Sequence, residues 1–442
     1  MTGPQPQASH LVEVRDDVVR VQLRGELDVS VAADVAAWLE GAVDGHPRKD
    51  LEVDLGTLEF LDSSGIRALL NVYAMVTAKG RLFRVTGASG GVREVLEIVD
   101  VHDLLTGGGN HQAGGGVGQS MQAIQVSQPG GPEVLRPAQV PAPEPGPGQV
   151  LVDLAAAGVN FIEIYQREGR YQMPLPFTPG GEGAGVVSAV GDGVETVKPG
   201  DRVASVDLDG SYAAQALAAT DRVVPIPEGI ETETAAALIL QGMTAHYLLK
   251  EVYAVKPGDT ILVHAAAGGM GLLLTQLGVK LGARVIGTVS TEAKELLARE
   301  AGAAEVIRYT EQDVVKEVRR LTDGAGVAAV FDAVGKDTFD ASLDSLRVRG
   351  TLALYGAASG PVPAFDPMRL QHAGSVKLTR PTLRHFILDA RELRGRAADV
   401  FGWVADGTLK VRIHERYPLA DAQRAHEDLK GRRTTGKLLL VP

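Results

Sequence analysis

The chain of 442 residues contains no cysteine. Disulfide bonds, thiolate zinc sites and a cysteine nucleophile are therefore excluded. Long apolar runs are also missing, since no uninterrupted stretch approaches the roughly 20 residues that a membrane-spanning helix needs. The polar segment 1–10 has no apolar core of the kind found in a secretory signal. These absences lead us to expect a cytoplasmic protein without a membrane span.

Basic residues are outnumbered by acidic ones, with 44 Lys and Arg against 55 Asp and Glu and a net charge of −11. Binding to nucleic acid requires a basic face, so this balance argues against a nucleic-acid partner. The length exceeds that of one typical domain and predicts two or three folding units.

A glycine-rich segment at residues 107–118 has almost no apolar side chains. Such a segment buries too little surface to order itself and behaves as a tether. We therefore predict a first domain at residues 1–106 and a linker at 107–120. Within the first domain, strand patterns at 18–24, 51–55 and 81–86 alternate with helix patterns at 31–43, 66–78 and 92–99, which predicts a sheet with helical crossovers.

Two different patterns follow the linker. Residues 121–240 contain short strands separated by Pro-Gly turns, which is typical of a small irregular β-barrel. From about residue 245, strands and helices alternate. Parallel strands are predicted at 260–264, 284–288, 305–308, 327–332 and 351–355. The final segment, 410–442, is expected to return to short strands.

The most informative stretch is a strand followed by a glycine-rich turn and an apolar helix. It reads His264-Ala-Ala-Ala-Gly268-Gly269-Met270-Gly271 after the strand Ile261–Val263. Such a turn presents free backbone N–H groups and the positive end of a helix dipole to a phosphate. The stretch therefore predicts a dinucleotide site, although Ala266 occupies the first glycine position of the usual pattern.

The end of the next strand indicates which dinucleotide is bound. Sites for NAD usually carry an acidic residue there, whereas this chain has Ser290, with Lys294 one turn later and Tyr309 after the third strand. A carboxylate would repel the 2′-phosphate of NADP, so the pattern favours NADP over NAD. In the alternative interpretation, Ser290 caps a helix and Lys294 is a solvated surface charge.

Several different short motifs are spread along residues 121–442: Gly130–Leu135, Gly158–Tyr165, Gly242–Tyr247, His264–Gly271, Thr379–Pro381 and Asp421–His426. With these motifs the segment resembles the zinc-independent quinone oxidoreductases (zeta-crystallin-like) of the medium-chain dehydrogenase/reductase superfamily. The resemblance implies an α/β architecture and commonly a homodimer. A GroES-like β-barrel catalytic domain is expected at 121–244, completed by about 380–442. A Rossmann domain with a doubly wound parallel sheet is expected at 245–379.

Carried over position by position, the resemblance implies that Asn160 and Tyr165 are catalytic and face the nicotinamide. The residues it implies for NADPH binding are Asn160, Tyr165, Thr244, Gly268, Gly269, Met270, Gly271, Ser290, Lys294, Tyr309, Tyr355, Gly356 and Thr382. The family more often has Phe-Gly-Asn where this chain has Tyr355-Gly356-Ala357. One polar contact near the nicotinamide is therefore expected to be missing.

No metal site is expected. Zinc-dependent relatives carry Gly-His-Glu where this chain has Gly180-Gly181-Glu182, so too few zinc ligands remain, and we expect Glu182 to be structural. Without a Lewis acid, an alcohol is difficult to activate, whereas a quinone carbonyl needs less help. Positioning of two rings can supply most of the catalysis. Tyr165 either donates a proton or orients the substrate, or it packs against the cofactor.

The first domain carries its own motif, Asp62-Ser63-Ser64-Gly65, between a strand and a helix, and Gly25-Glu-Leu-Asp28 follows an earlier strand. Asp62 alone fits an ordinary helix N-cap. Together the motifs resemble the STAS domains of bacterial anti-sigma-factor antagonists, over residues 9–106 and with a mixed sheet. The resemblance implies phosphorylation of Ser63, or of the neighbouring Ser64, by an anti-sigma factor kinase. The added charge would disrupt an interface.

The sequence thus predicts an NADPH-dependent quinone reductase tethered to a STAS domain, transferring hydride to a quinone or another electron-poor conjugated carbonyl. One alternative is an enoyl-thioester reductase, which turnover of benzoquinone and of crotonyl thioester would distinguish. The other is an anti-sigma-factor antagonist signalling protein whose reductase domain senses nucleotide. Labelling of Ser63 or Ser64 by a kinase and ATP would test it.

Overall fold

The computed structural model describes residues 8–15, 17–28, 31–79, 81–98, 101, 105–106 and 120–442. The chain divides into two compact units, residues 1–117 and 118–442. The predicted linker at 107–120 lies outside the described residues, except for Ser120 at the start of the second unit's first strand. We call the units the STAS unit and the reductase unit, after the two resemblances, and describe each by itself.

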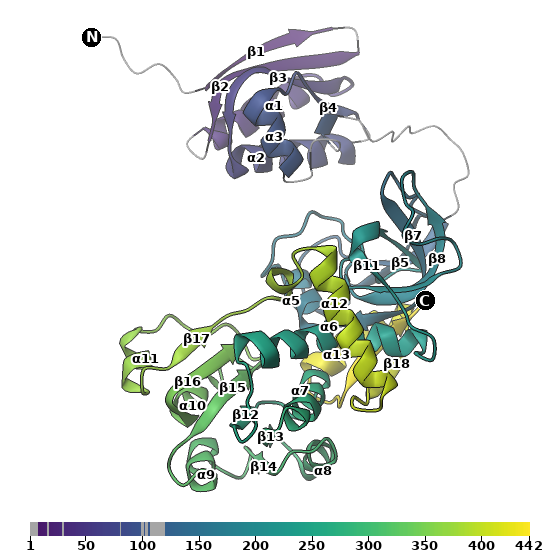
Figure 1. Cartoon of the computed structure of the whole chain (residues 1–442). Helices are drawn as coiled ribbons and strands as arrows, with labels where there is room; N and C mark the ends of the chain where they lie inside the picture. Colours follow the sequence, from purple (N-terminus) through teal and green to yellow (C-terminus); the bar gives the residue numbers. More distant parts are fainter. Residues whose placement is uncertain are drawn as a thin grey trace. The chain divides into compact units, whose positions relative to one another are not determined.

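The STAS unit is a four-stranded sheet in the order β1-β2-β3-β4 with three helices (Figure 1). β1 runs antiparallel to β2, and the other neighbouring strands are parallel. The strands are β1 (Ala8–Val14), β2 (Val18–Leu27), β3 (Asp50–Leu61) and β4 (Phe83–Thr86). The helices are α1 (Ala32–Gly45), α2 (Ser63–Ala78) and α3 (Gly90–Ile98). The predicted mixed sheet with helices is therefore confirmed.

Apolar and polar residues alternate along β2, and this alternation explains why one face of the sheet packs against the helices. Val19, Val21 and Leu23 are buried in a core shared with the helices, whereas Arg20 and Gln22 lie on the opposite face. Both polar side chains bond Asp54 of β3 there. Strand β1 was not predicted, because all of its residues after Ala8 are exposed and no buried face marks it in the sequence.

The barrel of the reductase unit is a mixed sheet in the order β11-β9-β8-β7-β19-β18, with β10 pairing β7 and a separate β5-β6 hairpin. Its strands are β5 (Ser120–Gln125), β6 (Arg136–Pro141), β7 (Gln149–Val159), β8 (Gly183–Val190), β9 (Arg202–Ser205), β10 (Gln215–Ala219), β11 (Val223–Pro225), β18 (Ile413–Pro418) and β19 (Lys437–Val441). The central pairing of β19 with β7 joins the end of the chain to the start of the unit.

The second sheet is fully parallel, in the order β14-β13-β12-β15-β16-β17. Its strands are β12 (Thr260–Val263), β13 (Arg284–Val289), β14 (Glu305–Arg308), β15 (Val327–Asp332), β16 (Leu346–Leu354) and β17 (Lys377–Thr379). The helices along this part are α7 (Gly269–Lys280), α8 (Glu292–Glu300), α9 (Val314–Leu321), α10 (Phe339–Ser345) and α11 (Met368–His372). This is the doubly wound order, in which ligands bind beyond the carboxyl ends of the strands. The five strands predicted here are present, and β17 adds a sixth.

Four further helices complete the unit: α5 (Phe161–Arg167), α6 (Thr232–Tyr247), α12 (Ala390–Ala405) and α13 (Ala422–Lys430). The last was missed, since short strands alone were expected at 410–442. Its buried side chains are few and small, so its apolar signal is weak; they are Ala422, Ala425 and His426. Helix α6 spans the predicted boundary between residues 244 and 245 and belongs to a core that both sheets share.

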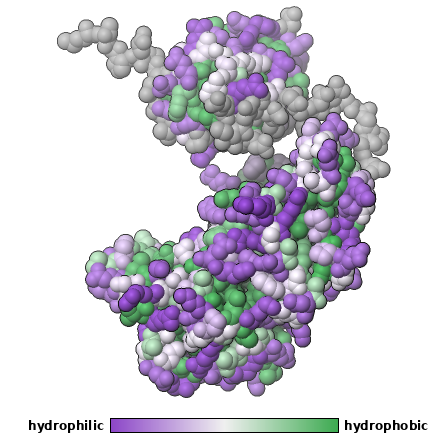
Figure 2. Space-filling model, in the orientation of Figure 1, coloured by the Kyte–Doolittle hydropathy of each residue, from purple (hydrophilic) through white to green (hydrophobic). Residues whose placement is uncertain are grey.

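Hydrophilic residues predominate on the face shown in Figure 2, with hydrophobic residues in small separate groups. In the part of the chain that the structure describes, no helix combines the length and apolar character needed to cross a membrane.

The start of α2 offers a test of packing in the STAS unit. A Cβ at Gly65 would lie 1.8 Å from Leu27 Cδ2, whereas a Cβ at Gly41 in α1 meets nothing within 4 Å. We expect Gly65→Ala to destabilise this unit by about 1–3 kcal/mol through overpacking. Gly41→Ala is the matched control and should stabilise it by about 0.5–1 kcal/mol. Urea unfolding followed by Trp38 fluorescence in a Trp403→Phe background measures both, and equal effects would contradict the packing argument.

Candidate functional site

A cleft of about 1460 Å³ runs between the barrel and the parallel sheet of the reductase unit. All thirteen residues that the sequence assigned to cofactor binding line it, from Asn160 in the barrel to Thr382 after the last strand of the parallel sheet. The structure thus brings the whole predicted set together. Their individual roles stay predictions.

The glycine-rich turn forms one wall of the cleft at the start of α7. Leu272 N makes the first intrahelical bond, to Gly268 O at 2.9 Å, so the N–H groups of the three preceding residues remain for a ligand. A Cβ at Gly271 would lie 2.2 Å from Ala265 O, and one at Gly269 would lie 2.3 Å from Gln241 Oε1. Backbone therefore requires glycine at position 271, whereas a Cβ at position 269 would need the Gln241 side chain to move. The turn fits a phosphate group approached by backbone amides.

Two cations lie at the far end of this wall. Lys294 Nζ donates to Arg432 O at 2.6 Å, and both residues line the cleft with Ser290 and Tyr309. Burial, and then the neighbouring Arg432 guanidinium, lower the pKa of Lys294. Because an anion placed here would meet two positive charges, this end fits the 2′-phosphate of NADP better than a bare ribose.

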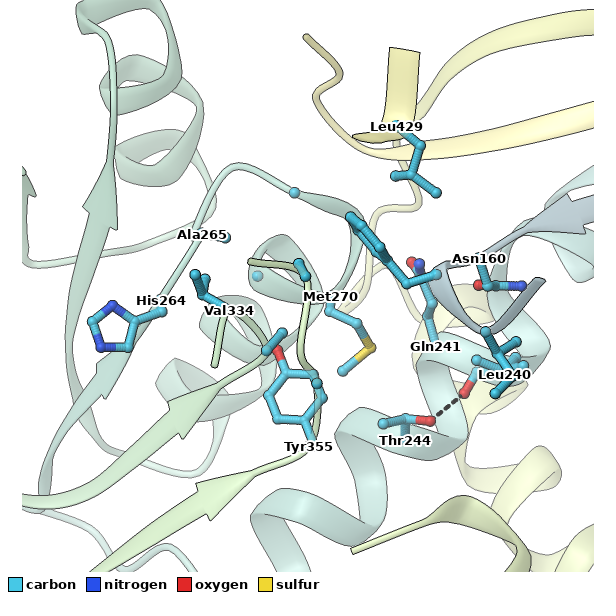
Figure 3. A pocket seen from close by; sticks show the side chains of 18 of the residues that line it. Asn160, Leu240, Gln241, Thr244, His264, Ala265, Met270, Val334, Tyr355 and Leu429 are labelled. Carbon is cyan, nitrogen blue, oxygen red and sulfur yellow. Dashed lines mark hydrogen bonds between the residues drawn. The ribbon is translucent and has the colours of Figure 1, made fainter. Parts of the chain in front are cut away.

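The opposite end of the cleft is aromatic and apolar. Figure 3 shows Met270 and Tyr355 pointing into it from the parallel-sheet side and Thr244 from α6. Thr244 Oγ1 donates to Leu240 O at 2.7 Å, which fixes its rotamer. Burial raises the pKa of Tyr355, so its hydroxyl stays neutral. These side chains provide a flat, largely apolar surface for a ring.

Tyr165 crosses the cleft from α5. Its hydroxyl oxygen accepts a hydrogen bond from Ala357 N at 3.2 Å, and the Arg170 guanidinium lies 5.1 Å from its ring centre. Burial raises the pKa of Tyr165. The polar contact to the nicotinamide that the sequence expects to be missing stays a prediction. The Tyr165 proton remains available to donate, because the hydroxyl oxygen is the acceptor in its bond to Ala357.

The side-chain amide of Asn160 does not point freely into the cleft. Its Nδ2 donates to Glu182 Oε2 at 2.9 Å, and its Oδ1 accepts from Lys437 Nζ at 2.6 Å. Glu163 Oε2 accepts from Asn160 N at 2.7 Å and completes the N-terminal cap of α5. Burial raises the pKa of Glu163 to about 8, against the opposing effect of the Lys437 ammonium. The expected structural role of Glu182 agrees with these contacts.

His264, which directly follows β12, is buried and hydrogen-bonded through both ring nitrogens. Its Nδ1 lies 3.0 Å from Thr288 Oγ1 and its Nε2 lies 3.0 Å from Ser342 Oγ, which itself donates to Asp332. Burial lowers the pKa of His264. Since Ser342 gives its only proton to Asp332, Nε2 carries the imidazole proton. These bonds make His264 a hydrogen-bonded core residue.

The residues present do not make a zinc site. Among the described residues, no group of three or more His, Cys, Asp or Glu side chains is arranged to hold a metal ion. A Cβ at Gly181 would lie 3.0 Å from Val206 O, so the histidine of zinc-dependent relatives has no room without a backbone shift.

The cleft residues that sequence reasoning missed include Glu163, Gln241, Arg432 and Lys437. A polar Gln241 in an apolar helix and a lone Lys437 before the run Leu438–Leu440 were visible signals. Arg432 carried none, because it reaches the site only through the fold.

In the STAS unit, Asp62 caps α2, its Oδ1 accepting from Ser64 N at 2.8 Å and Gly65 N at 3.0 Å. The N-cap interpretation of this residue is therefore correct. Ser63 begins the helix, but its side chain lies outside the described part, so its assignment as phosphoacceptor stays a prediction.

Three family models match the chain. Residues 10–106 match "Mlab, STAS domain", residues 146–228 match "Alcohol dehydrogenase GroES-like domain" and residues 301–440 match "Zinc-binding dehydrogenase". The first unit is thus a STAS domain. The quinone oxidoreductase of Pseudomonas aeruginosa is 44% identical over 321 residues, which are 72% of this chain and 99% of that protein. The reductase unit belongs to the quinone oxidoreductase family.

Solved structures agree with this assignment. A mycobacterial protein complexed with NADPH has a TM-score of 0.71 and 52% identity, covering 73% of this chain and all of that one. The quinone oxidoreductase of Escherichia coli complexed with NADPH has the same TM-score, with 42% identity over 73% of this chain and 100% of that chain. The GroES-like and Rossmann architecture predicted for the quinone oxidoreductase unit is confirmed, as is its assignment as an oxidoreductase.

The buried carboxyl group of Glu163 in α5 predicts that the stability of the fold depends on pH. The pKa of Glu163 is about 8 in the folded chain against 4.5 ordinarily, so the folded state keeps a proton that the unfolded state loses. The protonated Glu163 side chain contributes fully to stability at a pH below its pKa in the unfolded state. This contribution is lost as the pH rises through its pKa in the folded state. Relative to wild type, we expect Glu163→Gln to gain a few kcal/mol in unfolding free energy between about pH 5 and about pH 8.5.

The matched control is Glu168→Gln. The Glu168 carboxylate bonds Lys430 and its pKa is lowered. The contribution of Glu168 to stability is lost only in acid. The difference in unfolding free energy between Glu168→Gln and wild type should therefore stay constant between about pH 5 and about pH 8.5. Urea unfolding across the pH series measures both variants. Parallel curves for wild type and Glu163→Gln would contradict the prediction.

Proposed function

We propose that the reductase unit is an NADPH-dependent quinone reductase that transfers hydride to a quinone or another electron-poor conjugated carbonyl. One observation carries the proposal: a single cleft joins the glycine-rich turn, the Lys294–Arg432 cation pair and Tyr165. The NADPH bound by the mycobacterial and Escherichia coli relatives supports the choice of cofactor.

The residues present fit this cofactor along its whole length. The amides at the start of α7 would hold the pyrophosphate, and Lys294 with Arg432 would hold the 2′-phosphate. Met270, Thr244 and Tyr355 would line the nicotinamide half. When bound, the cofactor supplies the hydride. The chain's own contribution is to orient two rings and to keep water from them.

The substrate side suits a flat acceptor. The ring of Tyr165 lies 6.2 Å from that of Phe161 and 6.3 Å from that of Tyr171, centre to centre. Such a wall stacks well against a planar quinone. The hydroxyl of Tyr165 can donate its proton toward the acceptor oxygen that becomes negative, because its hydrogen bond with Ala357 N uses only the hydroxyl oxygen. The packing role left open by the sequence becomes secondary in this proposal.

The STAS domain adds a second module whose role the reductase cleft does not define. That an anti-sigma factor kinase binds the STAS domain and that the chain is a homodimer both stay predictions from resemblance.

The first test is turnover. Purified protein should oxidise NADPH when benzoquinone is added, with NADH much weaker, as followed at the nicotinamide absorbance band. Lys294→Ala should raise KM for NADPH by about 10- to 100-fold, since a charge-assisted hydrogen bond is lost, and leave KM for NADH unchanged. Lys280→Ala, at an exposed lysine that bonds Thr408, is the control. Tight NADPH binding without turnover would contradict a reductase, and absence of binding would contradict the cofactor site.

A second prediction separates the two roles of Tyr165. Tyr165→Phe keeps the ring and removes the proton, so kcat should fall by about 10- to 100-fold while KM for NADPH changes little. Tyr253→Phe removes a hydroxyl that bonds Asp259 away from the cleft and should leave kcat unchanged. Steady-state kinetics at saturating quinone measure both variants. An unchanged kcat in Tyr165→Phe would show that the residue acts by packing alone.

A further inference from the structure

Four buried polar side chains meet behind the nicotinamide half of the cleft, and we call them the Lys437 cluster: Asn160, Glu163, Glu182 and Lys437. Lys437 is 2% exposed, and its ammonium lies 2.5 Å from Glu182 Oε2 and 2.6 Å from Asn160 Oδ1. The four residues come from β19, from α5 with its cap and from the turn before β8. Residues far apart in sequence therefore share one buried ion pair.

Glu182 links this ion pair to α6. Its Oε1 accepts from Leu240 N at 2.9 Å, while its Oε2 accepts from Asn160 Nδ2. Leu240 O in turn accepts from Thr244 Oγ1. One carboxylate thus holds the cap of α5, which carries Tyr165, against the middle of α6, which carries Thr244. The geometry of both cleft walls depends on where that carboxylate lies.

A carboxylate buried this deeply is stable only when it is paired and fully hydrogen-bonded. Glu182 is 0% exposed, and Lys437 is the cation in contact with it. The other titratable groups facing the cluster are Glu163, whose pKa burial raises, and Tyr212, whose pKa burial also raises. The Lys437–Glu182 ion pair therefore lies beside two groups whose raised pKa values favour their neutral forms.

We propose that Lys437 is a positioning residue of the reductase. Its ammonium keeps Glu182 paired, and Glu182 then fixes Asn160 and α6 against the nicotinamide half of the cleft. Lys437 acts through Glu182 and does not itself touch the reacting atoms. The inference rests on the proposed reductase function.

Lys437→Met tests the proposal by removing the charge while keeping the length of the side chain. The unpaired Glu182 carboxylate should then shift or draw in water, so kcat should fall by about 10- to 100-fold, because small misplacements near reacting groups are costly. KM for NADPH should change by less than about threefold, since the phosphate contacts lie elsewhere. A fall in kcat with KM for NADPH almost unchanged would not follow from a general loss of structure, which would weaken cofactor binding as well.

A double substitution keeps the test decisive even if Lys437→Met does not fold. Once Glu182→Gln has removed the anion, adding Lys437→Met should change kcat by less than about threefold, because the lysine has no carboxylate left to hold. A further loss of about tenfold in that background would overturn the proposal. Lys430→Met, which removes an exposed lysine paired with Glu168, is the matched control and should leave kcat unchanged.

Wild-type turnover and the unfolding free energies of the wild type and the four variants are measured alongside. No wild-type turnover would contradict the proposed function itself. Wild-type turnover with an unchanged kcat in Lys437→Met would contradict the positioning role alone. A rise in KM for NADPH as large as the fall in kcat would likewise overturn it. In unfolding, the double variant should recover stability relative to Lys437→Met, because both buried charges are gone.

Discussion

The burial of most of helix α6 is the constraint on which the reductase unit depends. Its apolar residues belong to one core that reaches into the barrel and into the parallel sheet. At Gly242 the helix approaches α12 so closely that a Cβ would lie 2.5 Å from Val400 Cγ1. Because packing from both sides fixes the helix, the two polar side chains that it presents to the cleft, Gln241 and Thr244, have defined positions.

Polar contacts supply what apolar packing cannot, namely the orientation of groups near the nicotinamide half. Packing is non-directional, whereas the Glu182 carboxylate must meet three donors from three elements: Asn160, Leu240 and Lys437. The same region holds no histidine at Gly181 and no room for one. A buried ion pair therefore organises a part of the barrel where zinc-dependent relatives carry a metal ligand.

The two units use the same local structure in opposite ways. Each joins a strand to a helix through a short turn that exposes backbone N–H groups. In the reductase unit, glycines leave the groups before Leu272 open to a ligand. In the STAS unit, the Asp62 carboxylate occupies those of Ser64 and Gly65. The match to the Pseudomonas relative covers 72% of this chain and 99% of that protein, so the STAS domain is an addition to the reductase.

The sequence alone determined many of the local structural elements, because local sequence patterns indicate local structure. The strands of the parallel sheet, the glycine-rich turn before α7 and the cap at Asp62 follow from periodicity, glycine and capping chemistry. Strand β1 and helix α13 were not predicted from the sequence, since neither has a strong pattern of buried apolar residues. Only the tertiary structure decided that Lys437 pairs with Glu182 and that Arg432 joins Lys294. Those contacts join residues far apart in the chain, and no local pattern encodes which distant charges the fold will bring together.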